Sequence, residues 1–158
     1  MNGAIIDKAA IRRLIPHAGA MCLLDEVLSW DEASIHCRST THRDAAHPLA
    51  RGGRLAALHL LEYGAQAMAI HGGLRAAAAG GVAAPGVLVS ARDVQLDVER
   101  IDDIEAALDI HAQRLVASGG GWLYGFDVSA AGRRLATGRV AVIPSDNAKS
   151  GNANLPSP

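Results

Sequence analysis

Residues 55–70 read LAALHLLEYGAQAMAI, and this stretch decides the fold. Apolar side chains recur on nearly every side of the helix that it predicts, which we place at residues 54–70. A helix without a polar face has to be enclosed by protein or lipid, and this one is too short to span a bilayer. The sequence therefore predicts a central helix covered by the rest of the chain, with Gly72 and Gly73 ending it.

The segment before this helix predicts a short helix, a hairpin and a loop. Residues 4–15 place apolar side chains at roughly helical spacing and stop at Pro16, where a helix tends to end. Between residues 21 and 41, apolar and polar side chains alternate on both sides of Asp31–Glu32, which predicts two strands joined by a polar turn. Residues 42–53 are rich in arginine, histidine and glycine, and predict a loop that carries ionisable groups to the surface.

Four further strands are predicted after the central helix. A low-complexity connection over residues 75–86 leads to the first of them, and glycine-containing turns at 119–121 and 131–132 separate the last three. The apolar side chains of the first strand change phase at Arg92–Asp93, as they do at a β-bulge. The four strands are predicted at residues 87–98, 105–117, 122–129 and 133–143.

Length and composition fit one small α+β domain. With 158 residues, 49% of them hydrophobic, the chain can bury its own core, and we place the domain at residues 1–144. Five to six antiparallel strands would curl around the helix, or a second copy would cover it, because the apolar side chains on its outer side would otherwise be exposed to water. Residues 145–158 hold too few apolar side chains to fold and are predicted to be disordered.

Charge and cysteine content exclude several classes of protein. The 15 Lys and Arg residues balance 16 Asp and Glu residues, so no net field attracts nucleic acid or an anionic membrane surface. Cys22 and Cys37 come without a secretory signal pattern, and no uncharged apolar run is long enough for a spanning helix. The motifs of serine hydrolases, nucleotide-binding enzymes and zinc proteases are missing. We expect a cytoplasmic protein without a nucleic-acid partner.

Glu62 is the acidic residue of the predicted central helix and the first candidate for chemistry. Burying a carboxylate among apolar side chains raises its pKa towards the range of a general acid. The alternative is that Glu62 lies on a solvent-exposed face of the helix and pairs with an arginine. His59 and Gln66 lie on the same side of the helix and are candidates for substrate contact. His59 and Glu62 could also share a metal, but no third ligand stands at a recognisable spacing, so we expect no metal and no other cofactor.

Two short motifs stand in the N-terminal half. Residues 14–27 read LIPHAGAMCLLDEV, and residues 60–67 read LLEYGAQA. Over residues 10–72 the chain resembles the 3-hydroxyacyl-acyl carrier protein dehydratases of the hotdog superfamily, and its Glu-Tyr pair is most similar to the subgroup of aryl-polyene gene clusters. The resemblance implies a hotdog fold, in which a curved sheet wraps a long helix. It also implies elimination of water from a 3-hydroxyacyl thioester to give the 2-enoyl thioester.

The resemblance also implies a catalytic pair, a loop histidine and a helix carboxylate donated by opposite protomers. Glu62 takes the carboxylate position, and His47 is the first choice for the base, with His59 as its rival. The loop here reads His-Pro-Leu where the family has His-Phe-Pro-Gly. A backbone amide at the helix start would polarise the thioester carbonyl. That position falls on Ala57, and Gly53 would shape the helix entrance.

Partners and alternatives follow from the same resemblance. It implies an acyl carrier protein that bears an acyl-phosphopantetheine, and a homodimer or a hetero-oligomer with a related dehydratase. Carrier proteins are acidic, so basic residues are candidates for docking: Arg51, Arg54, Arg75, Arg133 and Arg134. Two other functions stay open, a hotdog acyl thioesterase and a non-catalytic partner subunit of a dehydratase.

Overall fold

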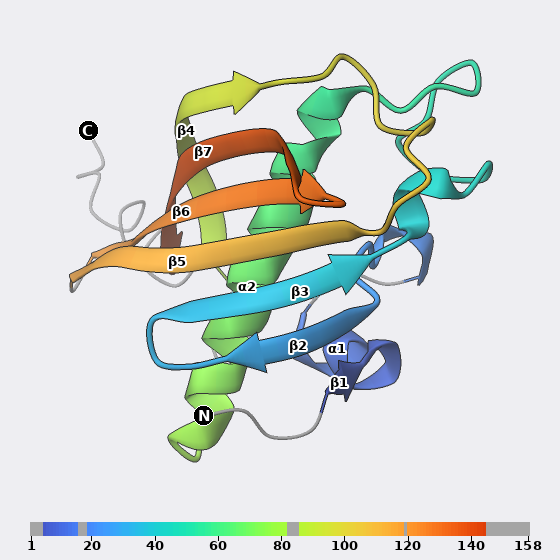
Figure 1. Ribbon diagram of the computed structural model, residues 1–158. Coiled ribbons are helices and arrows are strands. Elements are labelled where there is room, and N and C mark those ends of the chain that lie inside the picture. The colour runs from blue at the N-terminus through green and yellow to red at the C-terminus, as the bar shows by residue number, and fades with distance from the viewer. Residues whose placement is uncertain (1–4, 16–18, 82–85, 119, 145–158) are drawn as a thin grey trace, which may run out of the picture.

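One long helix packs against one face of a curved antiparallel sheet (Figure 1). The computed structural model describes residues 5–15, 19–81, 86–118 and 120–144, and the tail predicted to be disordered lies outside them. The helices are α1 (Lys8–Leu14) and α2 (Leu60–Ala78). The strands are β1 (Ile6–Asp7), β2 (Glu26–Trp30), β3 (Ser34–Ser39), β4 (Gly86–Leu96), β5 (Leu108–Ser118), β6 (Gly121–Ala130) and β7 (Arg133–Pro144).

The sheet confirms the predicted architecture and has one strand more than predicted. Its order is β1-β2-β3-β5-β6-β7-β4, and neighbouring strands are antiparallel. The additional strand is β1, which we had assigned to a helix over residues 4–15. Asp7 separates the two elements, because its side chain accepts a hydrogen bond from the Ala10 N–H and so caps α1, which begins at Lys8.

The predicted bounds of the central helix were wrong at both ends. A 3-10 turn over Ala57–His59 precedes α2, and the helix continues through Gly72 and Gly73. A Cβ on Gly73 would lie 3.2 Å from the Leu14 carbonyl oxygen, so this glycine lets α1 approach closely instead of ending α2. Gly80 ends the helix, since it adopts a positive φ of 80°.

The burial of α2 is one-sided, which corrects the prediction of a helix enclosed all round. Leu60, Tyr63 and Ile70 face the sheet and are fully buried. The opposite stripe, which includes Leu61, Glu62, Ala65, Ala69 and Gly72, is half-buried or exposed. The sheet curves around only one side of the helix (Figure 1), so the described part of the chain leaves a largely apolar stripe uncovered.

Strand β4 forms one edge of the sheet and pairs with β7. Its register shifts between Arg92 and Gln95, and Asp93 has a φ of 52°, which confirms the predicted bulge. Large apolar side chains are exposed along it: Val87, Leu88, Val89, Val94 and Leu96. A long apolar edge strand is a surface that proteins normally keep covered.

Candidate active site

Gln66 holds the Glu62 carboxylate in place from the next turn of α2. The Gln66 side chain is fully buried, and its Nε2 donates to Glu62 Oε1 (3.1 Å) and to the Met21 carbonyl oxygen (2.7 Å). Its Oε1 accepts from the Leu23 N–H (2.9 Å). Both amide N–H bonds are therefore used, and Gln66 ties the carboxylate to the backbone that precedes β2. A direct contact of Gln66 with substrate stays a prediction.

Glu62 is half-buried, where the sequence predicted a carboxylate enclosed among apolar side chains. The reason is the one-sided packing of α2, since Glu62 belongs to the stripe that faces away from the sheet. A half-buried carboxylate on an apolar stripe can meet a ligand or a partner chain that covers this stripe.

His47 is buried, with 5% of its surface exposed, although the sequence placed the ionisable groups of its loop at the surface. The Leu49 N–H donates to His47 Nδ1 (3.1 Å), and His47 Nε2 lies 3.1 Å from the Tyr63 hydroxyl. Because Nδ1 accepts a hydrogen bond, the proton of the neutral ring sits on Nε2 and is donated to Tyr63.

Tyr63 continues this chain of hydrogen bonds into the protein. Its hydroxyl lies 2.8 Å from Thr41 Oγ1, which in turn donates to the Leu23 carbonyl oxygen (2.8 Å). Burial raises the pKa of Tyr63, so the hydroxyl stays protonated. Tyr63 belongs to the Glu-Tyr pair of the family motif, but no role was predicted for it from the sequence. Its signal was a phenol in an otherwise aliphatic helix, since a buried tyrosine hydroxyl usually has a partner.

His59 lies near both His47 and Glu62. It is half-buried in the 3-10 turn that leads into α2, three residues before Glu62. Burial lowers the pKa of His47, and the charged form of His59 lowers it further, so the two rings are within electrostatic reach. In the described parts of the chain, no hydrogen bond engages the His59 ring.

The roles that the resemblance gave to Ala57 and Gly53 stay predictions, and the structure shows the backbone contacts of both residues. The Ala57 N–H donates to the Glu99 carbonyl oxygen (2.9 Å), so the predicted donor to a thioester is already used. The cause is pairing of this segment with the connection that follows β4. Gly53 has a φ of 73° and lies in an exposed turn between Arg51 and Arg54, where a Cβ would meet open space.

A comparison over most of the sequence decides the family. Residues 9–152 match the family described as ApeP-like, the ApeP dehydratase. The chain belongs to the ApeP-like dehydratase family. This result confirms the resemblance carried by the motifs at residues 14–27 and 60–67. No curated protein matches the chain in sequence.

Solved structures confirm the hotdog fold of this ApeP-like chain. The dehydratase heterocomplex ApeI:P from Xenorhabdus doucetiae matches with a TM-score of 0.79 and 24% identity, over 90% of this chain and 97% of that chain. A hypothetical thioesterase protein with coenzyme A from Streptococcus pneumoniae TIGR4 matches with a TM-score of 0.54 and 12% identity, over 75% and 83%. S. sahachiroi AziG gives 0.56 and 16%, over 84% and 98%.

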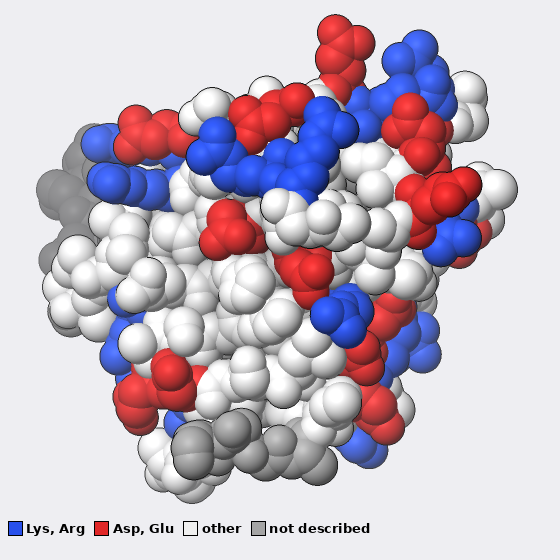
Figure 2. All heavy atoms as spheres, in the orientation of Figure 1, with Lys and Arg blue, Asp and Glu red and all other residues white. Residues whose placement is uncertain are grey.

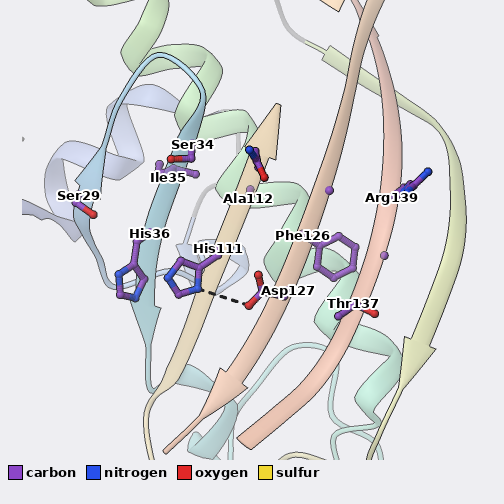
Figure 3. A pocket seen from close by; sticks show the side chains of 13 residues that line it. Ser29, Ser34, Ile35, His36, His111, Ala112, Phe126, Asp127, Thr137 and Arg139 are labelled. Atoms are coloured by element: carbon purple, nitrogen blue, oxygen red, sulfur yellow. Dashed lines mark ion pairs between the residues drawn. The ribbon is translucent and has the colours of Figure 1, made fainter. Parts of the chain in front are cut away.

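His47 lines the smaller of two hollows on the described part of the ApeP-like chain that we compare. This pocket of about 170 Å³ lies between α1 and the histidine loop, with Lys8 and Arg12 among its lining residues. The larger hollow, of about 630 Å³, lies on the outer face of the sheet and includes neither His47 nor Glu62 (Figure 3).

The two histidines of the larger hollow are each paired with a carboxylate on a neighbouring strand. The rings of His36 and His111 stack with centroids 4.0 Å apart. His36 Nε2 lies 2.9 Å from Asp109 Oδ1, and His111 Nδ1 lies 3.6 Å from Asp127 Oδ1, the contact dashed in Figure 3. These cross-strand side-chain contacts stabilise the sheet, and we assign no catalytic role to this hollow.

Charges of both signs are interspersed on the surface of the ApeP-like chain. On the face shown in Figure 2, Lys and Arg alternate with Asp and Glu towards the margins, and the centre is largely uncharged. Two of the predicted docking residues are in ion pairs, Arg75 with Glu32 (3.2 Å) and Arg134 with Asp97 (2.7 Å). The other candidates, Arg51, Arg54 and Arg133, are exposed, and so is Arg134.

Across residues 5–15, 19–81, 86–118 and 120–144, no group of three or more His, Cys, Asp or Glu side chains could hold a metal ion. In the same residues, no helix has the length and apolar character needed to cross a membrane.

Proposed function

We propose that this dehydratase eliminates water from a 3-hydroxyacyl thioester and releases the 2-enoyl thioester. The observation that carries the proposal is Glu62, a carboxylate fixed by Gln66 on an otherwise apolar stripe of the central helix. Leu61, Ala65 and Ala69 on the same stripe offer a surface on which an acyl chain can lie. Membership in a dehydratase family supports the reaction class.

The chemistry needs one proton acceptor and one proton donor. An imidazole removes the proton at C2, the electron pair forms the C2–C3 double bond, and the C3–O bond breaks. Glu62, in its protonated form, delivers a proton to the departing hydroxyl, which leaves as water. The loop residue His47 is the imidazole that the family resemblance indicates, and His59 is the other candidate close to Glu62.

The proposed substrate is carried by an acyl carrier protein in the cytoplasm. The basic residues Arg51, Arg54 and Arg133 are exposed and suit an acidic carrier. Coenzyme A would present the same phosphopantetheine arm, so an assay that offers both carriers distinguishes them.

We also propose that the chain works as a dimer or in a hetero-oligomer with a related dehydratase. The edge of β4 and the stripe of α2 both expose apolar side chains to water, and a partner chain would bury them. The similar chain from Xenorhabdus doucetiae comes from a heterocomplex.

Replacing Glu62 tests the proposal directly. The Glu62→Gln variant keeps the shape of the side chain and removes the acid, so we expect folding to persist and enoyl formation to fall at least about 100-fold. The assay follows enoyl product and free thiol together, alone and with the related dehydratase of the same host. Glu105→Gln, at an exposed residue outside the helices and strands, is the control.

The outcomes separate the possible functions. A full rate of enoyl formation in Glu62→Gln would refute the role of this carboxylate. Free thiol released from a saturated acyl thioester, without enoyl product, would identify a thioesterase, the activity named for the hypothetical thioesterase protein of similar fold. Activity only of the companion enzyme, unaffected by Glu62→Gln, would identify a non-catalytic subunit.

A further inference from the structure

The hydrogen bonds of His47 leave it no free lone pair for a substrate proton. Nδ1 already accepts from the Leu49 N–H, and Nε2 carries the proton that is donated to Tyr63. Protonation would place an N–H on Nδ1, directly against the Leu49 N–H at 3.1 Å. A general base must hold the proton that it receives, and these contacts oppose the cationic form.

The loop around His47 is fixed by its own hydrogen bonds. The His47 N–H donates to the Asp44 carbonyl oxygen (3.0 Å), and the Ala50 N–H donates to the His47 carbonyl oxygen (3.0 Å). Asp44 Oδ1 also accepts from the Ala46 N–H (2.8 Å). Pro48 further restricts the backbone of His47. Freeing Nδ1 therefore requires several contacts to break together.

The charged groups around His47 also act on its protonation. Burial is the largest cause that lowers the pKa of His47, and the cationic forms of His59 and His42 lower it further, while Asp44 raises it. The balance keeps the ring neutral, in agreement with the donor that faces Nδ1.

His59 has the properties that His47 lacks. It is half-buried, and its ring makes no hydrogen bond within the described residues. Residues three apart in a helical segment are neighbours on its surface, so the His59 imidazole and the Glu62 carboxylate point to the same side. Both nitrogens of His59 are thus available beside the carboxylate that Gln66 positions.

We infer that His59, not His47, supplies the imidazole of the dehydration, and that Thr41 and Tyr63 hold His47 as a neutral positioning residue. The inference rests on the proposed function and names its base. In the reaction, His59 takes the proton from C2, the C2–H electron pair becomes the double bond, and the hydroxyl leaves C3 with a proton from Glu62. A proton returns from His59 to Glu62 before the next turnover, so no other reactant is consumed.

Steady-state rates of two histidine variants test the assignment, measured on the full chain with its companion dehydratase if one is needed. We expect His59→Gln to lower kcat at least about 100-fold. His47→Gln should lower kcat by a much smaller factor than His59→Gln does, because a glutamine amide can still donate to Tyr63. His111→Gln, on the outer face of the sheet, is the matched control. A His59→Gln variant with the wild-type rate would overturn the inference.

Nuclear magnetic resonance of the histidine rings tests the state of His47 without any assay of activity. The His47 signals are identified by their loss in His47→Gln. We expect the Nε2–H tautomer and a pKa below that of a free imidazole, because burial lowers the pKa of His47. Tyr63→Phe should alter the Nε2 signal selectively. A His47 ring that carries its proton on Nδ1, or that titrates normally, would contradict the inference.

The Glu62 and histidine variants distinguish an error in the inferred base from an error in the proposed function. Loss of enoyl formation in Glu62→Gln together with a wild-type rate in His59→Gln would leave the dehydratase function standing and exclude His59 as the base. A wild-type rate in Glu62→Gln would refute the proposed function itself.

Discussion

The side chain of Gln66 connects the candidate site to the rest of the protein through its hydrogen bonds. The motif that first drew attention to it contains a glutamate and a glutamine one turn apart. The structure adds that the amide reaches back to Met21 and Leu23. The glutamine is therefore needed for the fold as well as for the orientation of Glu62.

Replacing Gln66 should cost stability. Gln66→Ala leaves the Leu23 N–H and the Met21 carbonyl group without their partner in a buried region, so we expect the free energy of unfolding to fall by about 2–4 kcal/mol. Urea denaturation measures the loss. Gln113→Ala, at an exposed residue of β5, should change it by less than about 0.5 kcal/mol. Equal effects of the two changes would show that the Gln66 contacts are not structural.

Three buried imidazoles should make stability depend on pH. Burial lowers the pKa of His42, His47 and His71 in the folded protein, whereas an unfolded chain keeps them near about 6.5. Below about pH 6.5 the unfolded chain binds more protons than the native state does. The free energy of unfolding therefore falls as the pH drops below this value and does not change with pH above it.

His71 offers the clearest test of this dependence. Its Nε2 donates to the Asp31 carbonyl oxygen (2.7 Å), and its Nδ1 lies 2.8 Å from the Tyr124 hydroxyl. Urea denaturation at pH 7.5 and 5.5 should show a smaller loss in His71→Gln than in the wild type, by up to about 1.4 kcal/mol per pH unit. An unchanged difference would mean that His71 does not resist protonation.

Among the secondary-structure elements, α2 depends on a close contact with the sheet. Phe126 of β6 fills the space left by two glycines, because a Cβ on Gly64 would lie 2.8 Å from its ring and one on Gly138 would lie 2.7 Å from it. The ring is thus confined on both sides. Glycine in the middle of a helix is unfavourable by itself, so its presence at residue 64 reflects this packing.

Two glycine-to-alanine changes in the same helix separate packing from propensity. In Gly64→Ala the overlap with Phe126 outweighs the gain of about 1 kcal/mol in helix propensity, and we expect a net loss of about 2 kcal/mol. In Gly72→Ala the new methyl group meets open space, so we expect a gain of up to about 1 kcal/mol. Thermal unfolding of both variants measures this. A stabilised Gly64→Ala would show that the ring adjusts freely.

At the scale of the whole molecule, the two sheet edges differ. The edge formed by β1 is two residues long, whereas β4 extends over eleven residues with apolar side chains exposed along it. Side chains of β4 therefore offer the larger surface for another chain. A partner on this edge would extend the sheet by backbone hydrogen bonds.

Lysine substitutions at the two edges test where association occurs. Val89 is 51% exposed on β4, and Ile5 is 60% exposed just before β1 at the other edge. We expect Val89→Lys to shift the protein towards monomer in analytical ultracentrifugation, because burying an unpaired ammonium group at an interface is costly. Ile5→Lys should leave the distribution unchanged. The reverse pattern would place the interface at the β1 edge.

The sequence by itself determined the class of fold and the place of Glu62 on the central helix. Hydrophobic periodicity is local, so the hairpin, the four later strands and the central helix could be predicted from residues near one another. The extra strand β1 and the true ends of α2 could not. They depend on the Asp7 cap and on the approach of α1 to Gly73.

Only the tertiary structure decided how the candidate site is connected. The partner of His47 is Tyr63, the Ala57 amide is taken by Glu99, and Gln66 bonds to backbone more than forty residues away. No spacing rule predicts such pairs, because a hydrogen bond between distant residues exists only once packing has placed their elements within about 3 Å of each other.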